Sequence, residues 1–214
     1  IPPFGNVVDY LVYGGIYREV WLEITESTYI ENVFVKTPNA LAPDKTIEAD
    51  ITLNESAQGQ FTFSLCEKGK VLKVHTFSFE GKMIHTVWKI GDAKLWDVDD
   101  PNLYTLRITY QGDNTEVRFG FREARFTRTG FVLNGRPIQL LGLNRHQSYP
   151  YVGYAMPASA QRDDADTLKY RLGCNFVRTA HYPDSIHFLD RCDEIGLLVF
   201  TEMPSWQFLG EGEW

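Results

Sequence analysis

The sequence has few cysteines and lacks a long apolar run. Its three cysteines, Cys66, Cys174 and Cys192, are an odd number without paired spacing. Such a set is typical neither of a disulfide framework nor of a zinc site, so we expect buried free thiols in a reducing compartment. No apolar stretch approaches the ~20 residues that a membrane-spanning helix needs, and no signal peptide is recognisable after Ile1. We therefore expect a cytoplasmic protein without a membrane partner.

Basic charge is also scarce. Lysine and arginine number 21 against 28 acidic residues, which gives a formal net charge of -7, and no basic run interrupts the chain. A nucleic-acid partner is therefore not expected, because such partners require a basic patch or stripe. Aromatic residues, in contrast, make up 14% of the 214 residues. This content suits β-rich packing and surfaces on which sugars stack.

The first half of the chain is patterned as β-strands. Residues 47–54 and 104–110 alternate strictly between apolar and polar side chains, and 117–121 repeat the pattern. Further candidate strands are 29–37, 60–66, 71–79 and 83–89, separated by turns at Pro38–Asn39, Glu67–Lys70, Glu80–Gly81 and Gln111–Asn114. About seven short strands with regular turn signals predict an immunoglobulin-like β-sandwich at 26–124. Residues 1–25, which Gly14–Gly15 interrupt, are interpreted as the tail of a preceding β-domain.

The second half alternates strands with helices. We expect strands at 137–143, 175–179 and 197–200, with helices at 160–172 and 184–195 between them. The helices end at Gly173 and Gly196, and the second is entered through Pro183. Short apolar strands that alternate with helices predict a parallel sheet.

Polar residues follow each of these three strands. The candidates are Asn144, Arg145 and His146 after the first, Arg178 and His181 with Tyr182 after the second, and Glu202 after the third. The carboxyl ends of parallel strands form the ligand site both in (β/α)8 barrels and in open sheets, so one shared site is expected. The structural alternatives are that His181 is a buried histidine with a structural partner and that Arg178 and Glu202 form a stabilising ion pair.

Five segments resemble glycoside hydrolase family 2, which includes β-galactosidases, β-glucuronidases and β-mannosidases. They are 13–20, 119–122, 133–146, 175–183 and 192–200, and the run Asn175-Phe-Val-Arg-Thr-Ala-His-Tyr-Pro183 is the most specific of them. The resemblance implies three parts in the family's order. These are the tail of a jelly-roll sugar-binding domain at 1–25, the immunoglobulin-like β-sandwich at 26–124, and the first βα units of a TIM (β/α)8 barrel at 125–214.

The resemblance also implies roles for the candidate site residues. Arg178 matches an arginine that supports the nucleophilic carboxylate, His181 a histidine of the sugar subsite, and His146 a histidine near the leaving group. Asn144 and Arg145 are expected to bind substrate, and Trp206 to stack on sugar. The run Asn144–Gln147 favours a β-galactosidase, hence a β-galactoside substrate, and a homo-oligomer is compatible with this assignment.

Glu202 falls where β-galactosidases of the family place a carboxylate near a divalent cation such as Mg²⁺. The family's next ligand, a histidine two residues later, is Pro204 in this chain, which argues against the metal.

Retaining glycoside hydrolysis needs two carboxylates about 5–5.5 Å apart. The resemblance implies an acid/base in an Asn-Glu pair after the fourth barrel strand and a nucleophile after the seventh. The chain printed above reaches Trp214, just past the third strand, so we expect it to lack both glutamates and to be inactive alone. The alternatives are a β-glucuronidase or another β-glycosidase of the family, a non-catalytic carbohydrate-binding or scaffold fragment, and a metallohydrolase that uses His146, His181 and Glu202. The sugar, the linkage and the oligomeric state are left open.

Overall fold

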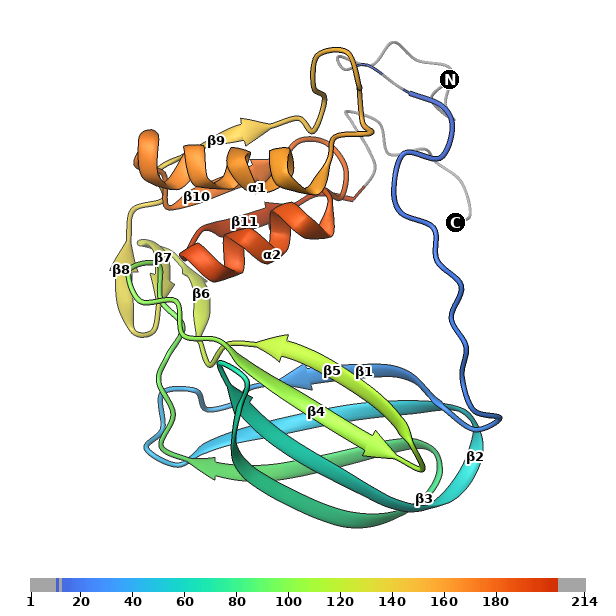
Figure 1. Ribbon diagram of the computed structural model, residues 1–214. Helices are drawn as coiled ribbons and strands as arrows, with labels where there is room; N and C mark the ends of the chain where they lie inside the picture. Colours follow the sequence, from blue (N-terminus) through green and yellow to red (C-terminus); the bar gives the residue numbers. More distant parts are fainter. Residues whose placement is uncertain (1–10, 12, 204–214) are drawn as a thin grey trace, which may run out of the picture. The chain divides into compact units, whose positions relative to one another are not determined.

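The computed structural model describes Leu11 and residues 13–203, and the chain divides into two compact units (Figure 1). Residues 22–139 form the first, here called the sandwich unit. The second, here called the α/β unit, combines residues up to Trp21 with those from Leu140 onward. Each unit is described by itself.

Five antiparallel strands make up the main sheet of the sandwich unit. They are β1 (Ile30–Lys36), β2 (Lys45–Glu67), β3 (Lys70–Gly91), β4 (Tyr104–Tyr110) and β5 (Asp113–Phe119). The strand order is β1-β2-β4-β5, with β3 also paired to β2. The predicted alternation of 104–110 is confirmed, because Tyr104, Leu106, Ile108 and Tyr110 are buried and the residues between them are not.

Strands β2 and β3 have 23 and 22 residues, more than twice the length of any strand predicted there. Each merges two predicted strands, so the unit has five long or medium strands in this sheet instead of about seven short ones. The expected turn at Glu80–Gly81 is wrong, since Gly81 pairs with Ala57 inside the β2–β3 ladder. The register shifts between Thr52 and Ala57, and Gly81 has a φ of 122°. A bulge with a glycine opposite lets both strands bend without ending, as Figure 1 shows.

The core of the sandwich unit is aromatic and aliphatic. Phe61 packs against Phe79, whose ring centroid is 4.2 Å away, and against Tyr110, at 5.3 Å. Trp88 and Trp96 are buried too, so both pack in the interior. Since the side chains of alternate strand residues fill one continuous interior, burial of apolar area is the main stabilising contribution here.

A separate three-stranded sheet follows at the end of the sandwich unit. It consists of β6 (Ala124–Thr127), β7 (Gly130–Leu133) and β8 (Arg136–Ile138), all antiparallel. The predicted strand at 137–143 is therefore wrong as one element. Its first residues belong to β8, and β9 begins only at Gly142. The two residues between β7 and β8, Asn134 and Gly135, both have positive φ, which is the geometry of a tight hairpin.

The α/β unit has the predicted alternating order. Its elements are β9 (Gly142–Arg145), α1 (Ala158–Asp166), the π-helical turn η1 (Thr167–Arg171), β10 (Phe176–Thr179), α2 (Ile186–Ile195) and β11 (Leu198–Thr201). The strands are parallel in the order β11-β10-β9, which confirms the parallel sheet. Helices α1 and α2 pack together over one face of β10, where Val177, Leu168 and Phe188 share a buried cluster. On the other face of the sheet, Phe200 in β11 is about half exposed.

Helix α2 begins and ends with clear capping residues. The Ser185 side chain accepts a hydrogen bond from the backbone N–H of His187, so the helix starts at Ile186, two residues later than predicted. Gly196 ends it in the left-handed conformation, as predicted.

The three cysteines are free and buried, as expected. In the part of the chain that the structure describes, no helix combines the length and apolar character that crossing a membrane demands.

Candidate functional site

The carboxyl ends of β9, β10 and β11 bring the predicted polar residues to one sheet edge. In the parallel register Asn144 lies beside Arg178, and Arg178 lies beside Phe200. Val177 and Thr179, the neighbours of Arg178 in β10, are fully buried, so Arg178 lies on the half-exposed face of the sheet. Asn144 and His146 are exposed, whereas Arg145 between them is buried. Two-residue alternation therefore places Asn144, His146 and Arg178 on a common face.

Glu202 is held by two cationic or polar partners at this edge. The Arg178 guanidinium donates to Glu202 Oε1 through Nε and Nη2, and His181 Nδ1 lies 2.8 Å from Oε2. Burial opposes ionisation, but the hydrogen bonds from His181 and Arg178 prevail and lower the pKa of Glu202. The Glu202 side chain is 16% exposed and that of His181 is 14% exposed. Arg178 and Glu202 thus form a mostly buried ion pair, and the His181 ring lies against the second carboxylate oxygen; the three residues are here called the clamp.

His146 and Tyr182 extend this clamp. The rings of His146 and His181 meet edge to face with centroids 5.4 Å apart. The Tyr182 hydroxyl lies 3.5 Å from His146 Nδ1. Burial of the Tyr182 side chain raises the pKa of this hydroxyl. The ends of β9 and β10 contribute four residues and Glu202 follows β11, so the three strand ends form one polar cluster. It is here called the imidazole cluster and consists of His146, Arg178, His181, Tyr182 and Glu202.

Arg145 does not join the imidazole cluster. Its guanidinium donates to Asp184 Oδ2 at 2.6 Å, to Asp164 Oδ2 at 2.8 Å and to Gln161 Oε1 at 2.7 Å, and it lies 4.0 Å from the Phe188 ring centroid. The residue is only 6% exposed. Because these partners satisfy its donors beneath helices α1 and α2, Arg145 has a structural role instead of the predicted role in substrate binding.

Burial exceeds the attraction of Arg145 at Asp184 and raises the pKa of that carboxyl. Its second oxygen, Oδ1, is buried and has no hydrogen-bond partner among the described residues.

The remaining candidates are Trp206 and the predicted metal site at Glu202. Trp206 lies outside the described residues. The two carboxylate oxygens of Glu202 face the Arg178 guanidinium and the His181 ring, and within the described ranges no three His, Cys, Asp or Glu residues gather as a metal site. A guanidinium against the carboxylate is a poor environment for a divalent cation, and the residues that the structure describes do not assemble around it the oxygen ligands that Mg²⁺ prefers. The residues present therefore do not fit the predicted metal site, and we derive no chemistry through one.

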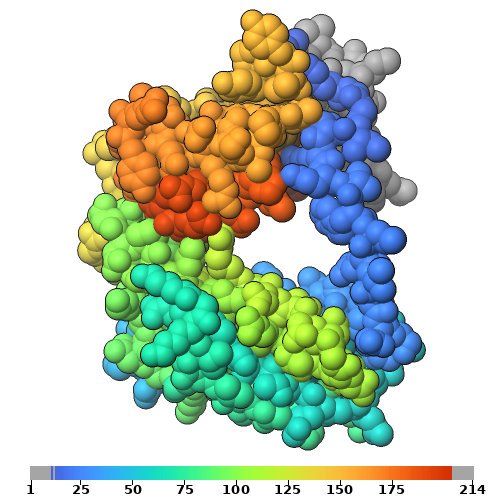
Figure 2. Space-filling model, viewed as in Figure 1, coloured from blue at the N-terminus to red at the C-terminus, as the bar shows by residue number. Residues whose placement is uncertain are grey.

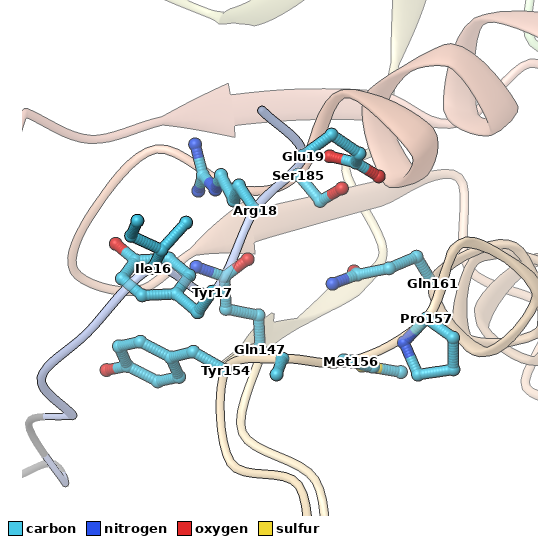
Figure 3. Close-up of a pocket in the computed structure, with 11 residues that line it drawn as sticks. Ile16, Tyr17, Arg18, Glu19, Gln147, Tyr154, Met156, Pro157, Gln161 and Ser185 are labelled. Atoms are coloured by element: carbon cyan, nitrogen blue, oxygen red, sulfur yellow. The ribbon is translucent and has the colours of Figure 1, made fainter. Parts of the chain in front are cut away.

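An additional group of residues was not predicted. Residues 13–19, here called the strap, run along the loops that follow β9 and β10, as Figure 2 shows for the blue segment against the orange and red ones. A pocket of about 290 Å³ lies between the strap and the loop before α1 (Figure 3). It is lined by Arg18, Glu19, Gln147, Tyr154, Gln161 and Ser185, among others.

The strap and this loop meet through contacts that join residues more than 130 positions apart, such as the 3.0 Å hydrogen bond between Tyr13 and Ser148. In the sequence, the strap was indicated only by the run 13–20 that resembles the family. Nothing in that run indicated which residues the strap contacts.

Two family models match the chain. The model described as "Glycosyl hydrolases family 2" matches residues 28–122, and the one described as "Glycosyl hydrolases family 2, TIM barrel domain" matches residues 125–209. The chain belongs to glycosyl hydrolase family 2. The predicted family and the predicted fold class, an immunoglobulin-like sandwich followed by the start of a TIM barrel, are thereby confirmed.

Relatives within family 2 resemble the whole chain. A β-galactosidase of Thermoanaerobacterium thermosulfurigenes is 46% identical over 228 aligned residues, which cover 100% of this chain and 32% of the relative. A β-galactosidase of Rhizobium meliloti is 42% identical, and the alignment covers 95% of this chain and 29% of the relative.

Among solved structures, the apo structure of Bacteroides uniformis β-glucuronidase 3 has a TM-score of 0.82 at 30% identity, covering 92% of this chain and 26% of that one. The chain spans about a third of the length of the curated relatives it matches.

Proposed function

We propose that the protein to which this chain belongs hydrolyses terminal β-galactosides with retention of configuration. The observation that carries the proposal is the imidazole cluster at the ends of three consecutive parallel strands, in a family 2 chain whose relatives at 42–46% identity are named β-galactosidases. The strand ends of a TIM barrel are where its active sites lie. We keep the domain limits 1–25, 26–124 and 125–214 as part of the proposal.

The residues of the cluster, together with Asn144 beside Arg178, have the following roles in this proposal. His181 and Asn144 bind hydroxyl groups of the galactosyl unit, because an imidazole and an amide each donate and accept hydrogen bonds. His146 lies toward the leaving group, with its ring oriented by Tyr182. Arg178 keeps Glu202 ionised and gives the site the positive charge that stabilises an anionic nucleophile.

Glu202 does not fit the role of proton donor. General acid catalysis in a glycosidase requires a carboxyl whose pKa is raised, whereas that of Glu202 is lowered. The family resemblance implies an acid/base after the fourth barrel strand and a nucleophile after the seventh, so we expect the 214-residue chain to be inactive alone.

The test is a panel of 4-nitrophenyl β-glycosides, with galactoside, glucuronide, glucoside and mannoside, assayed on the complete gene product and on the 214-residue chain. The galactoside should be turned over fastest by the complete protein, with no turnover by the chain. Anomeric configuration of the first-formed sugar, read by NMR, tests retention. Arg178→Met should lower kcat/KM by about 100-fold, because one preorganised charged donor is lost. Arg107→Met, at an exposed ion pair of the sandwich unit, is the matched control.

A β-glucuronidase is the second candidate, favoured by the solved structures of that name with TM-scores of 0.82 and 0.85. Preferred turnover of the glucuronide would support it. Inactivity of the complete protein on every sugar would favour a binding or scaffold role. A cytoplasmic location is also part of our proposal, supported by three buried free thiols.

A further inference from the structure

The strap is fastened to the loop that carries the imidazole cluster. Arg18 Nη2 donates to the backbone carbonyl of Pro183 at 2.8 Å, and Glu19 Oε1 lies 2.7 Å from His187 Nε2. Pro183 directly follows Tyr182, and His187 lies in the first turn of α2. These two contacts therefore fix both ends of the short segment between His181 and α2.

An aromatic chain connects the strap to the same loop. Tyr154 packs against Tyr13 at 4.7 Å, Tyr17 at 5.5 Å and Tyr182 at 5.3 Å between ring centroids. Its hydroxyl donates to the backbone carbonyl of Leu11 at 2.7 Å. Tyr182 in turn contacts the His146 ring. One continuous path of packed rings thus runs from the strap to the imidazole cluster.

The fit of the strap is close at one glycine. Gly153 has a φ of +57°, and a Cβ atom built there would lie 2.7 Å from the Tyr13 ring. A larger residue would push the strap away from Tyr154. In contrast, Arg18 and Glu19 are exposed, so their loss leaves no cavity and no buried unpaired charge.

We propose that Tyr13–Glu19 is a positioning element of the active site, which holds Tyr182 and His181 in register with His146 through Arg18, Glu19 and Tyr154. Arg18 and Glu19 contact Pro183 and His187, which flank the segment between His181 and α2, so the strap acts through this loop. The inference rests on the proposed function for its consequence in catalysis, but the geometry itself can be tested without turnover.

The first experiment measures geometry. The chain has five histidines, two of which, His75 and His85, lie in the sandwich unit and serve as internal references. Imidazole NMR resonances of the selectively labelled chain are compared between wild type and Arg18→Ala/Glu19→Ala. We expect displaced resonances for His146, His181 and His187 and unchanged ones for His75 and His85. The control is Arg107→Ala/Glu116→Ala, an exposed ion pair of the same residue types in the sandwich unit.

The second experiment measures turnover by the complete gene product with the preferred 4-nitrophenyl glycoside. We expect the strap double variant to lower kcat/KM by about tenfold with kcat falling more than KM rises, because misplaced groups weaken transition-state contacts. Arg18→Lys should restore part of the loss in the single Arg18→Ala variant, since an ammonium can still donate to the Pro183 carbonyl.

The two arms separate the possible failures. If His146 and His181 resonances stay in place in the strap double variant, the positioning role is wrong whatever the protein hydrolyses. If they move but the complete wild-type protein turns over no glycoside, the positioning inference holds as geometry and the proposed function fails. A fall in turnover equal to that of the Arg107→Ala/Glu116→Ala control would also overturn the positioning role.

Discussion

The two units of this chain are stabilised in different ways. The sandwich unit encloses an apolar interior in which Phe61, Phe63 and Leu106 are fully buried. The α/β unit covers one face of its sheet with helices and keeps a charged group, Arg145, at the centre of that packing. The face opposite the helices carries the half-exposed Phe200 and, through Arg178, the imidazole cluster. Burial of apolar area thus holds the first unit together, while directional polar bonds organise the unit that carries the chemistry.

Phe61→Ala should give the largest loss of stability in this comparison. The side chain is fully buried among three aromatic rings, so truncation removes apolar burial and leaves a cavity. We expect a loss of about 4 kcal/mol in the free energy of unfolding, measured by urea denaturation of the chain. Val74→Ala, at an exposed position of β3, is the control and should change little. A small loss for Phe61→Ala would contradict the role assigned to this core.

Arg145→Met should destabilise the α/β unit by about 3 kcal/mol, because Asp184 would be left buried without its ion-pair partner. The double variant Arg145→Met/Asp184→Asn should recover part of this loss, since the unpaired charge is then gone. Denaturation followed by a probe in the α/β unit measures both. Equal losses in the single and double variants would show that packing of the Arg145 stem, and not charge, dominates.

Gly135→Ala should cost about 1 kcal/mol, because Gly135 has a φ of +78° that alanine adopts poorly. A Cβ there would meet Leu41 only at an ordinary 3.8 Å, so the cost isolates backbone strain in the β7–β8 hairpin. Gly14→Ala is the matched control, with no atom near its Cβ and no positive φ. Thermal unfolding measures both, and an unchanged midpoint for Gly135→Ala would contradict the hairpin geometry.

The smallest expected effect is the pH dependence that Glu202 contributes. Its pKa in the folded chain lies below the unfolded value of about 4.3. Its ion pairs therefore add stability above that pH, and this stability is lost as the pH falls through the folded pKa. Glu202→Gln should flatten the acid limb of stability against pH below about 4.3. An identical acid limb in the variant would show that the clamp adds nothing.

The sequence predicted the fold wherever periodicity was strong. The alternation of 104–110 predicted a half-buried strand and the apolar run 197–200 a buried one, and both strands are present as β4 and β11. The predicted burial of the second is wrong in part, because Leu198 is buried but Phe200 is 48% exposed. The turn at Glu80–Gly81 was wrong because a bulge with a glycine and a turn use the same residue types. The β7–β8 hairpin was missed although Asn134-Gly135 is a strong hairpin signal.

The candidate site was partly predictable. Which strands end in polar residues can be read from the sequence, so the imidazole cluster was anticipated in outline. Arg145 was misplaced because its neighbours Asn144 and His146 were considered together with it, although successive strand residues point to opposite faces. The strap could not be anticipated, because its partners depend on contacts between residues such as Arg18 and Pro183, 165 positions apart.

That separation has a consequence for biosynthesis. The strap leaves the ribosome before the whole sandwich unit, and its hydrogen-bonding partners emerge only after residue 139 has been made. The sandwich unit is continuous in sequence, so it can fold during translation while the strap is still unpaired. Closing the long intervening loop costs entropy that grows only slowly with its length, so the late pairing is thermodynamically tolerable. Assembly of the α/β unit is therefore expected only after synthesis of the sandwich unit is complete.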